Sequence, residues 1–440
     1  MLLIKEKFLA VFCAFSPKLF PLTYFSQTST MFLCNTIFTK KWGSVMNKKV
    51  LIQDQTDMKL TNLLTIFNLL YNQAPISRAD LAKMSGMSPT SITRFVNNML
   101  TANLVIESPS DEKKVGRTAT MLTINESAFY SAGISIDSTH IHVSILNFRK
   151  QIVSDCYLQT HLTKPNLDYV LNIAYDLYLK ALELAGLQPS QICGIGMSMI
   201  GTMRNSETLE FIPQLNWKGL DISQAVRDRF QNDNVFIEND CNSALVGQLT
   251  LHPEYKDTTV ACLCIGSGVG SAVTYNGVLL SRPGYLPYSE IDHTIVEPGG
   301  MLCDCGNHGC LQTFLAENAL IERAQKYDPT VVRMDDIHSA WMQEVPWARE
   351  LIQTACTYAK VAINNLACLY NPEIILVGGE TIDAYWDMFE SILEDHDFYF
   401  EPFKHNLTVI PFFKIYQSSI FGVSRRVQDD YLQNLLRSTL

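Results

Sequence analysis

The 440-residue sequence lacks any long hydrophobic run: no uninterrupted apolar stretch approaches the roughly 20 residues that a membrane-spanning helix requires. Charged residues are scarce, at 18%, and acidic side chains outnumber basic ones by 44 to 34. The hydrophobic content of 47% is typical of a soluble protein with a sizeable core, and the length predicts two or three domains. These values exclude a disordered chain and a protein inserted in the membrane through a helix.

The twelve cysteines do not form the pattern of a disulfide framework, and we expect a reducing, cytoplasmic compartment. Three of them follow a histidine closely, so one imidazole and three thiols fall within eighteen residues: His293, Cys303, Cys305 and Cys310. This is the ligand set of a closed, structural zinc site, with one ion per chain. The alternative is three reduced cysteines that are close together by chance. The glycines at 306 and 309, which allow a tight turn, favour zinc.

The charge is unevenly distributed along the chain. Residues 46–124 carry nine basic and six acidic side chains, whereas residues 125–440 carry a net charge of −17. Because residues 46–124 are mildly basic and the following residues are strongly acidic, we expect only residues 46–124 to bind a polyanion.

Residues 58–124 have the pattern of a winged helix-turn-helix. An apolar stripe predicts a first helix over 58–71, and Ser77 and Gly86 are placed to cap the two ends of a second helix. Ser88 is placed to cap a third helix that begins at Pro89 and extends to Leu100. Two short strands, 104–106 and 120–124, then flank a polar wing tip. We assign residues 46–124 to a DNA-binding domain.

The third helix presents a polar face whose side chains have the size and chemistry to reach base edges and phosphates. The wing tip adds basic side chains suited to phosphates or the minor groove. The expected DNA-binding residues are Ser88, Thr90, Ser91, Thr93, Arg94 and Asn97 on the helix, with Lys113, Lys114 and Arg117 on the wing. The alternative is an ordinary solvated helix face, but the capping pattern and the basic wing favour DNA binding.

Residues 1–45 resemble a signal peptide only weakly. Lys5 and Lys7 precede a short apolar run, and no small-residue cleavage site follows it cleanly. A DNA-binding pattern after such a segment has no use outside the cell. We therefore expect residues 1–45 to be a disordered extension or the result of a misassigned start, with Met46 as the true first residue.

From residue 127 onward, strands alternate with helices, as in α/β folds. The expected strands are 133–136, 141–146, 192–197, 235–237, 259–265, 269–275 and 374–377. The expected long helices are 166–185, 349–370, 382–393 and 418–437, with a shorter one over 241–249. This pattern predicts two strand-rich lobes within an effector domain over 125–440.

The motif Glu290-x-x-His293, followed by Cys-x-Cys-Gly-x-x-Gly-Cys-Leu at 303–311, resembles the signature of the ROK family. That family groups sugar kinases with sugar-responsive repressors. The resemblance implies a two-lobed, actin-like and ribonuclease-H-like α/β fold with a cleft between the lobes. It also implies that Glu290 and His293 reach sugar hydroxyls, while the cysteines and the same histidine hold zinc.

Asn239 and Asp240 resemble the family's Asn-Asp-x-Asn turn, in which the Asn holds sugar hydroxyls and the Asp is the general base of the kinases. Asp240 could also cap the helix that follows it. The expected ligand-binding residues are Asn239, Asp240, Glu290, His293 and Gln312. Three positions depart from the family: Asp292 replaces a Gly, Gln312 replaces a Glu, and Ser198-Met199 replaces a Pro-Gly. Because Gln is neutral, we expect the ligand preference to shift.

The motifs that bind ATP in the family's kinases are less complete in this sequence. In the family's kinases, an Asp-x-Gly-Gly-Thr turn brings bare backbone close to the ATP phosphates. The corresponding turn here, Asp137-Ser138-Thr139-His140, lacks both glycines. A second segment, Gly266–Gly270, keeps its glycines, and Glu380 stands where the family tends to have a third glycine after Gly378-Gly379. We expect no catalytic residues, with an ATP-dependent hexose kinase as the alternative.

These features together predict a cytoplasmic ROK-type transcriptional regulator, of the repressor kind, for genes of carbohydrate uptake or metabolism. The expected partners are double-stranded operator DNA and either a sugar, a sugar phosphate or a regulatory protein. A homodimer or homotetramer is expected, because one short recognition helix reads too few bases to be specific alone.

Overall fold

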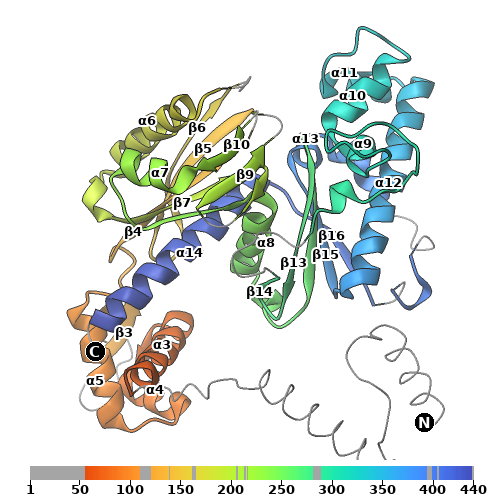
Figure 1. Ribbon diagram of the computed structural model, residues 1–440. Coiled ribbons are helices and arrows are strands. Elements are labelled where there is room, and N and C mark those ends of the chain that lie inside the picture. The colour runs from red at the N-terminus through yellow and green to blue at the C-terminus, as the bar shows by residue number, and fades with distance from the viewer. Residues whose placement is uncertain are drawn as a thin grey trace, which may run out of the picture. The chain divides into compact units, whose positions relative to one another are not determined.

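The computed structural model describes residues 55–109, 120–137, 139–160, 165–204, 207–212, 215, 217–280, 289–393, 399–403 and 406–438 (Figure 1). The chain divides into two compact units, residues 1–61 and 62–440, and of the first only the start of helix α3 (Gln55–Gln73) is described. The expected extension 1–45 lies outside the described residues, as do Ser138, Lys113, Lys114 and Arg117. Within the described ranges, no helix is both long and apolar enough to cross a bilayer.

The winged helix-turn-helix is confirmed in its described part. Helix α4 (Arg78–Ser85) lies between the expected caps, and α5 (Pro89–Thr101) begins at the expected Pro89 and ends one residue after the expected Leu100. Ser77 Oγ accepts a hydrogen bond from Asp80 N (3.2 Å), and Gly86 ends α4 with a φ of 69°. The sheet has the order β1 (Ile76–Ser77), β3 (Thr120–Ile124), β2 (Val105–Pro109), all antiparallel. Strand β1 was not expected, because two residues are too few to show a period.

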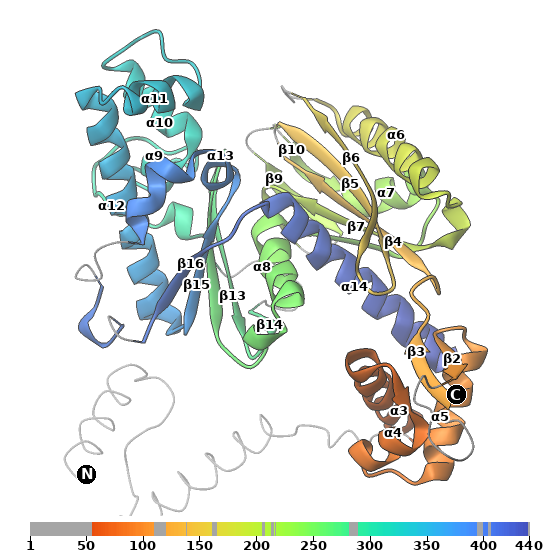
Figure 2. The same ribbon diagram turned by 180° about the vertical axis from the view of Figure 1, so that it is seen from behind.

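The first α/β lobe is built on a five-stranded sheet. The strand order is β11 (Val235–Asn239), β7 (Ile192–Met199), β4 (Tyr130–Ile136), β5 (His140–Asn147), β6 (Ile152–Gln159), and only β5 runs opposite to the other four. Helix α6 (Leu167–Ala185) packs on one face of this sheet. Helix α14 (Ile415–Ser438) packs on the other face, as Figure 2 shows.

Smaller elements complete this lobe. Helix α7 (Ile222–Phe230) packs beside α6, and a three-stranded sheet lies next to it, in the order β10 (Trp217–Asp221), β9 (Thr208–Ile212), β8 (Thr202–Met203). Neither α7 nor this sheet was expected. Their segments mix polar and apolar residues without a sustained period, so the burial of Trp217 and Leu209 in the lobe's core decides the structure.

The second lobe repeats the plan with the sheet order β14 (Val278–Leu279), β13 (Val269–Tyr275), β12 (Val260–Ile265), β15 (Ile374–Gly378), β16 (Thr408–Pro411). One face carries the larger core, formed with α9 (Gln312–Leu315), α10 (Glu317–Gln325), α11 (Met334–Met342), α12 (Pro346–Tyr370) and α13 (Glu380–Phe389). The other face packs on α8 (Asp240–Leu251). Helix α12 begins three residues before the expected start, because Pro346 fits the first helical position.

Helices α8 and α14 lie against each other between the two sheets (Figure 1). A Cβ on Gly247 would collide with the Ser418 carbonyl oxygen, and a Cβ on Gly422 would collide with the Ser243 carbonyl oxygen. Gln248 Nε2 also donates to Ser418 Oγ (2.8 Å) at this crossing. The two helices therefore meet backbone to backbone, and this contact joins the lobes.

We predict that Gly247→Ala destabilises the protein by about 1–3 kcal/mol, the usual cost of overpacking a close contact. The sign of the effect is informative. In an open helix position the same substitution would stabilise the protein by up to about 1 kcal/mol, because Ala has the higher helix propensity. Chemical denaturation of the wild type and the variant measures the difference. An unchanged or increased unfolding free energy would contradict the backbone contact.

Candidate functional site

Four potential metal ligands converge in the second lobe. His293 ends a short 3₁₀ turn, Ile291–His293, and the three cysteines come from the loop before α9. His293 Nδ1 lies 3.7 Å from Cys303 Sγ, and Cys305 Sγ lies 3.6 Å from Cys310 Sγ. All four ligand atoms lie within 4.8 Å of one another. Bonds of about 2.3 Å at tetrahedral angles separate two sulfur ligands by about 3.8 Å, so the cluster has the size of a tetrahedral site.

The loop can form this cluster because its backbone turns tightly. Gly306 N donates to Cys303 O (2.8 Å), and Cys303 N donates to Asn307 O (2.8 Å). Gly309 has a φ of 72°, and a Cβ there would collide with the Glu297 carbonyl oxygen. The sequence argument for a knuckle is therefore confirmed at Gly309, where both the torsion and the space exclude a side chain.

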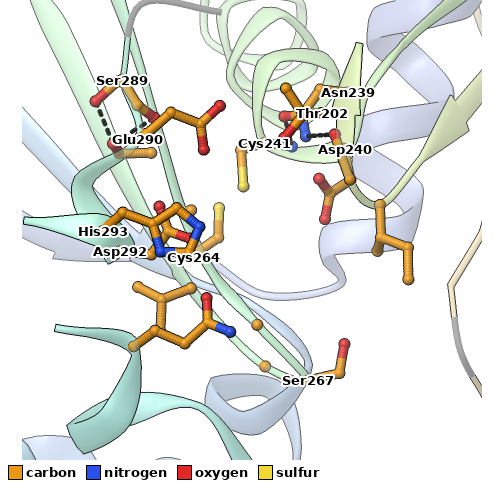
Figure 3. A pocket seen from close by; sticks show the side chains of 18 of the residues that line it. Thr202, Asn239, Asp240, Cys241, Cys264, Ser267, Ser289, Glu290, Asp292 and His293 are labelled. Carbon is orange, nitrogen blue, oxygen red and sulfur yellow. Dashed lines mark hydrogen bonds and ion pairs between the residues drawn. The ribbon is translucent and has the colours of Figure 1, made fainter. Parts of the chain in front are cut away.

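A cavity of about 420 Å³ lies beside the cysteine cluster. Its wall includes residues of the first lobe around Gly201, the N-terminus of α8 and the loop preceding the cluster. All five residues expected to bind the ligand line it: Asn239, Asp240, Glu290, His293 and Gln312. In Figure 3 the carboxyl groups of Asp240 and Glu290 point into the cavity from opposite sides.

Asn239, not Asp240, is the N-cap of α8. Asn239 Oδ1 accepts hydrogen bonds from Cys241 N (2.9 Å) and Asn242 N (3.2 Å), and its Nδ2 donates to Gly201 O (3.0 Å). The expectation that Asp240 could cap the helix is therefore wrong: the side chain one residue earlier does so, which leaves the Asp240 carboxyl free to face the cavity. Burial raises the pKa of Asp240 to about 6.

His293 faces both the cavity and the cysteine cluster. Its Nδ1 is directed toward Cys303, and its Nε2 lies 3.3 Å from Asp292 Oδ2. Asp292 is only 7% exposed. A carboxylate on the second ring nitrogen is the usual partner of a metal-bound histidine, because it fixes the tautomer and the ring orientation. Gln312 is the first residue of α9 and lines the wall beside this group.

The turn expected to lack phosphate-binding backbone is held by Asp137. Its Oδ1 accepts hydrogen bonds from Thr139 N (2.6 Å), Thr139 Oγ1 (2.8 Å) and His140 N (2.7 Å). These bonds stabilise the connection between β4 and β5. Burial opposes ionisation of Asp137, but the bonds from His140 and Thr139 outweigh it and lower its pKa.

The polar face of α5 is exposed at Thr90, Thr93, Arg94 and Asn97. Two of the expected DNA-binding side chains also have structural roles. Ser88 Oγ accepts a hydrogen bond from Ser91 N (3.2 Å), and Thr93 Oγ1 donates to Pro89 O (2.9 Å).

Several functional candidates were missed by sequence reasoning. Arg78 pairs with Glu107 on β2 and reaches Asn97 Oδ1 (3.5 Å), so it connects the recognition face to the wing. Thr202 and a hydrogen-bonded pair, Ser271 and Ser289, line the cavity without any sequence signal. Glu380 also lines it. The signal for Glu380 was its position directly after two glycines.

Comparison with family models assigns both parts of the chain. The model described as the ROK family matches residues 131–411, and a model of winged helix-turn-helix DNA-binding domains matches residues 60–106. The ROK match alone covers more than half of the chain.

Known proteins that resemble this chain include repressors and kinases. The xylose repressor of Bacillus spizizenii is 27% identical over 342 residues, which are 78% of this chain and 88% of that protein. The crystal structure of a ROK family transcriptional regulator, a homolog of the E. coli Mlc protein, has a TM-score of 0.71 at 20% identity and covers 87% of this chain and 99% of that one. A ROK family glucokinase from Streptomyces griseus, in complex with glucose and AMPPNP, has a TM-score of 0.58 at 20% identity, covering 68% and 98%.

Proposed function

The chain belongs to the ROK family, and we propose that it is a transcriptional repressor of genes for carbohydrate uptake or metabolism. The main support for this proposal is that one chain combines a capped winged helix-turn-helix with two lobes of the sugar-kinase type. The alignment with the xylose repressor of Bacillus spizizenii covers 78% of this chain and 88% of that protein. A DNA target implies a cytoplasmic location.

We assign residues 46–124 to DNA binding and residues 125–440 to effector binding. In the proposed mechanism, a ligand in the cavity tilts the lobes and thereby changes the spacing of two DNA-binding domains in a dimer. Operator half-sites lie at fixed spacing, so a dimer with altered spacing loses one of its two contacts. The effector is a sugar or a sugar phosphate, with a regulatory protein as the second candidate because Asp292 and Gln312 alter the pocket.

The DNA contacts proposed are the nine residues of the recognition helix and wing tip named above. Arg94 is exposed on α5, with its guanidinium 5.0 Å from the centroid of the Phe95 ring. Stacking on that ring holds a long side chain in place without using its donors, which remain available to a base or phosphate.

Arg94→Ala should weaken operator binding by about 1–3 kcal/mol and relax specificity at one base position, if Arg94 reads a base. Lys180→Ala, which removes an exposed charge from α6 in the effector lobe, is the matched control and should have no effect. Fluorescence anisotropy with the operator and with single-base variants measures both. Full operator binding by a chain that lacks residues 46–124 would refute the assignment.

We propose that the cluster of His293, Cys303, Cys305 and Cys310 binds one zinc ion with a structural role. The support is the spacing of the ligand atoms and the carboxylate on the outer nitrogen of His293. A bound zinc ion would cross-link the 3₁₀ turn to the cysteine loop. Four protein ligands leave no open position, so these residues hold structure and activate no water.

Elemental analysis of the purified protein should give about one zinc per chain. Cys305→Ser should lower both the zinc content and the melting temperature, because metal binding contributes to the folding free energy. Cys368→Ser is the control: this cysteine is exposed on α12, outside the cluster, and its loss should change neither value. Zinc well below half an equivalent in the wild type, with no response to chelation, would contradict the assignment.

The third proposal is that the cavity binds its ligand without phosphorylating it. The support is that Thr139 and Glu380 carry side chains in two turns where the family's kinases tend to have glycine, and these side chains contact Asp137 and the space beside Gly266. Asp240 and Glu290 face the cavity as hydrogen-bond acceptors for hydroxyl groups.

A sugar or sugar phosphate should therefore raise the melting temperature and release the operator, while ATP and magnesium give no phosphorylated product. Asp240→Asn should abolish the thermal shift. Because the raised pKa of Asp240 is about 6, its carboxylate is ionised at pH 7.5 but increasingly protonated below pH 6, so affinity should fall as the pH is lowered through that range. ATP-dependent turnover would contradict the proposal, and release only by a protein would favour the second candidate.

A further inference from the structure

The wall of the cavity is rich in carboxyl groups. Among its described residues five are acidic and none is Lys or Arg, and the acidic ones are Asp240, Glu290, Asp292, Asp304 and Glu380. The imidazole of His293 faces Cys303 through Nδ1 and Asp292 through Nε2. A phosphorylated ligand would therefore bring about two negative charges to a wall where no described cation is free to pair with them. Burying an unpaired charge is costly, whereas a neutral hydroxyl group can donate to these carboxylates.

Glu380 closes the part of the wall best suited to an anion. Glycine turns and helix N-termini attract anions because their N–H groups are exposed. Here the turn Gly266–Gly270 and the N-terminus of α13 meet at Glu380, which is the first residue of that helix. Its Oε2 lies so close to Gly266 that a Cβ there would collide with it, and Gly266 N already donates to Gly268 O (2.8 Å). The protein's own carboxyl group therefore occupies the space directly beside Gly266.

The electrostatic environment of Glu380 also disfavours a negatively charged ligand. Burial, followed by the charges of Asp137 and Asp240, raises the pKa of Glu380 well above its ordinary value. Glu317, which accepts a hydrogen bond from Thr381 Oγ1 (2.9 Å), adds a further carboxyl group to this end of the site. A phosphate here would meet the same burial and the same neighbouring charges.

We propose that the cavity selects uncharged sugars and rejects sugar phosphates and nucleotides, and that Glu380 is the specificity-determining residue. This inference rests on the proposed function, in which a small molecule in this cavity controls DNA binding. It narrows the effector from sugar or sugar phosphate to unphosphorylated sugar.

Calorimetric titration of the full chain with matched pairs tests the selection. The probes are D-glucose and N-acetyl-D-glucosamine, each against its 6-phosphate, together with D-xylose and with AMPPNP plus magnesium. At least one uncharged sugar should bind, about 100-fold or more tightly than any phosphorylated probe, because an unpaired buried charge carries a penalty of that order. Equal or tighter binding of a phosphate ester overturns the inference, and so does the failure of every uncharged sugar.

Two variants test the role of Glu380. Glu380→Gly clears the space beside Gly266, and Glu380→Gln keeps the shape of the side chain while removing its acidity. Glu380→Gly should bind a phosphorylated probe at least about tenfold more tightly than the wild type, since the steric block and one carboxyl group are both gone. Glu380→Gln should give a smaller gain, because the space stays filled. Glu350→Gln, at an exposed position on α12, is the control and should change nothing.

Melting temperature and operator binding confirm that each variant is folded. Unchanged affinity for every anion in a folded Glu380→Gly variant would show that Glu380 does not determine the selection. The experiments test the charge selection and the control of DNA binding separately. If a sugar phosphate releases the operator, the charge selection is wrong and the repressor function stands. If an uncharged sugar binds with the expected preference but leaves the operator bound, the selection stands and the proposed control of DNA binding is wrong.

Discussion

Helices α8 and α14 cross with their backbones in contact, and the arrangement of the two α/β lobes depends on this crossing. Gly247 and Gly422 are the residues that permit it, because any side chain at either position would collide with a carbonyl oxygen of the other helix. Helix α14 is also fixed to the first sheet, where Gln428 Nε2 donates to Ser131 Oγ (2.9 Å), while α8 packs on the second sheet. The pair of helices therefore connects the two sheets.

The N-termini of both helices are connected to the cavity wall, α8 directly and α14 through α13. The N-terminus of α8 carries Asn239 and Asp240 into the wall. The start of α14 is held by Asp383 of α13, whose carboxylate accepts hydrogen bonds from Lys414 N (2.7 Å) and Ile415 N (3.1 Å). Helix α13 in turn begins at Glu380 in the cavity wall. A ligand that moves either helix N-terminus thus acts directly on the elements that join the lobes, which gives the proposed tilting a physical route.

Sequence reasoning was most successful where chemistry or periodicity is local. The caps at Ser77 and Ser88 and the cysteine knuckle depend on neighbours within a few residues, so their patterns could be recognised directly. The five ligand-binding residues, expected from the family resemblance, do line one cavity. The capping role of Asn239 was missed because Asn and Asp are equally good caps and adjacent in the sequence. The Ser271–Ser289 pair joins residues 18 positions apart, which no local pattern contains. At Glu380 the sequence showed only a side chain where the family tends to have a glycine, and its contact with Gly266 comes from packing between distant segments.

His293 and Glu380 belong to two parts of the cavity wall that are held by different contacts. His293 is tied to the cysteine cluster on one side and to Asp292 on the other, so this part of the wall is held by contacts within the protein. Elsewhere in the cavity wall, Glu380 fills the space beside Gly266. Under the proposed function, such a pocket would lose nucleotide binding through single side chains while its polar wall stays intact. This is the property that a ligand-controlled DNA-binding protein requires of a kinase fold, because it must respond to a ligand that it does not consume.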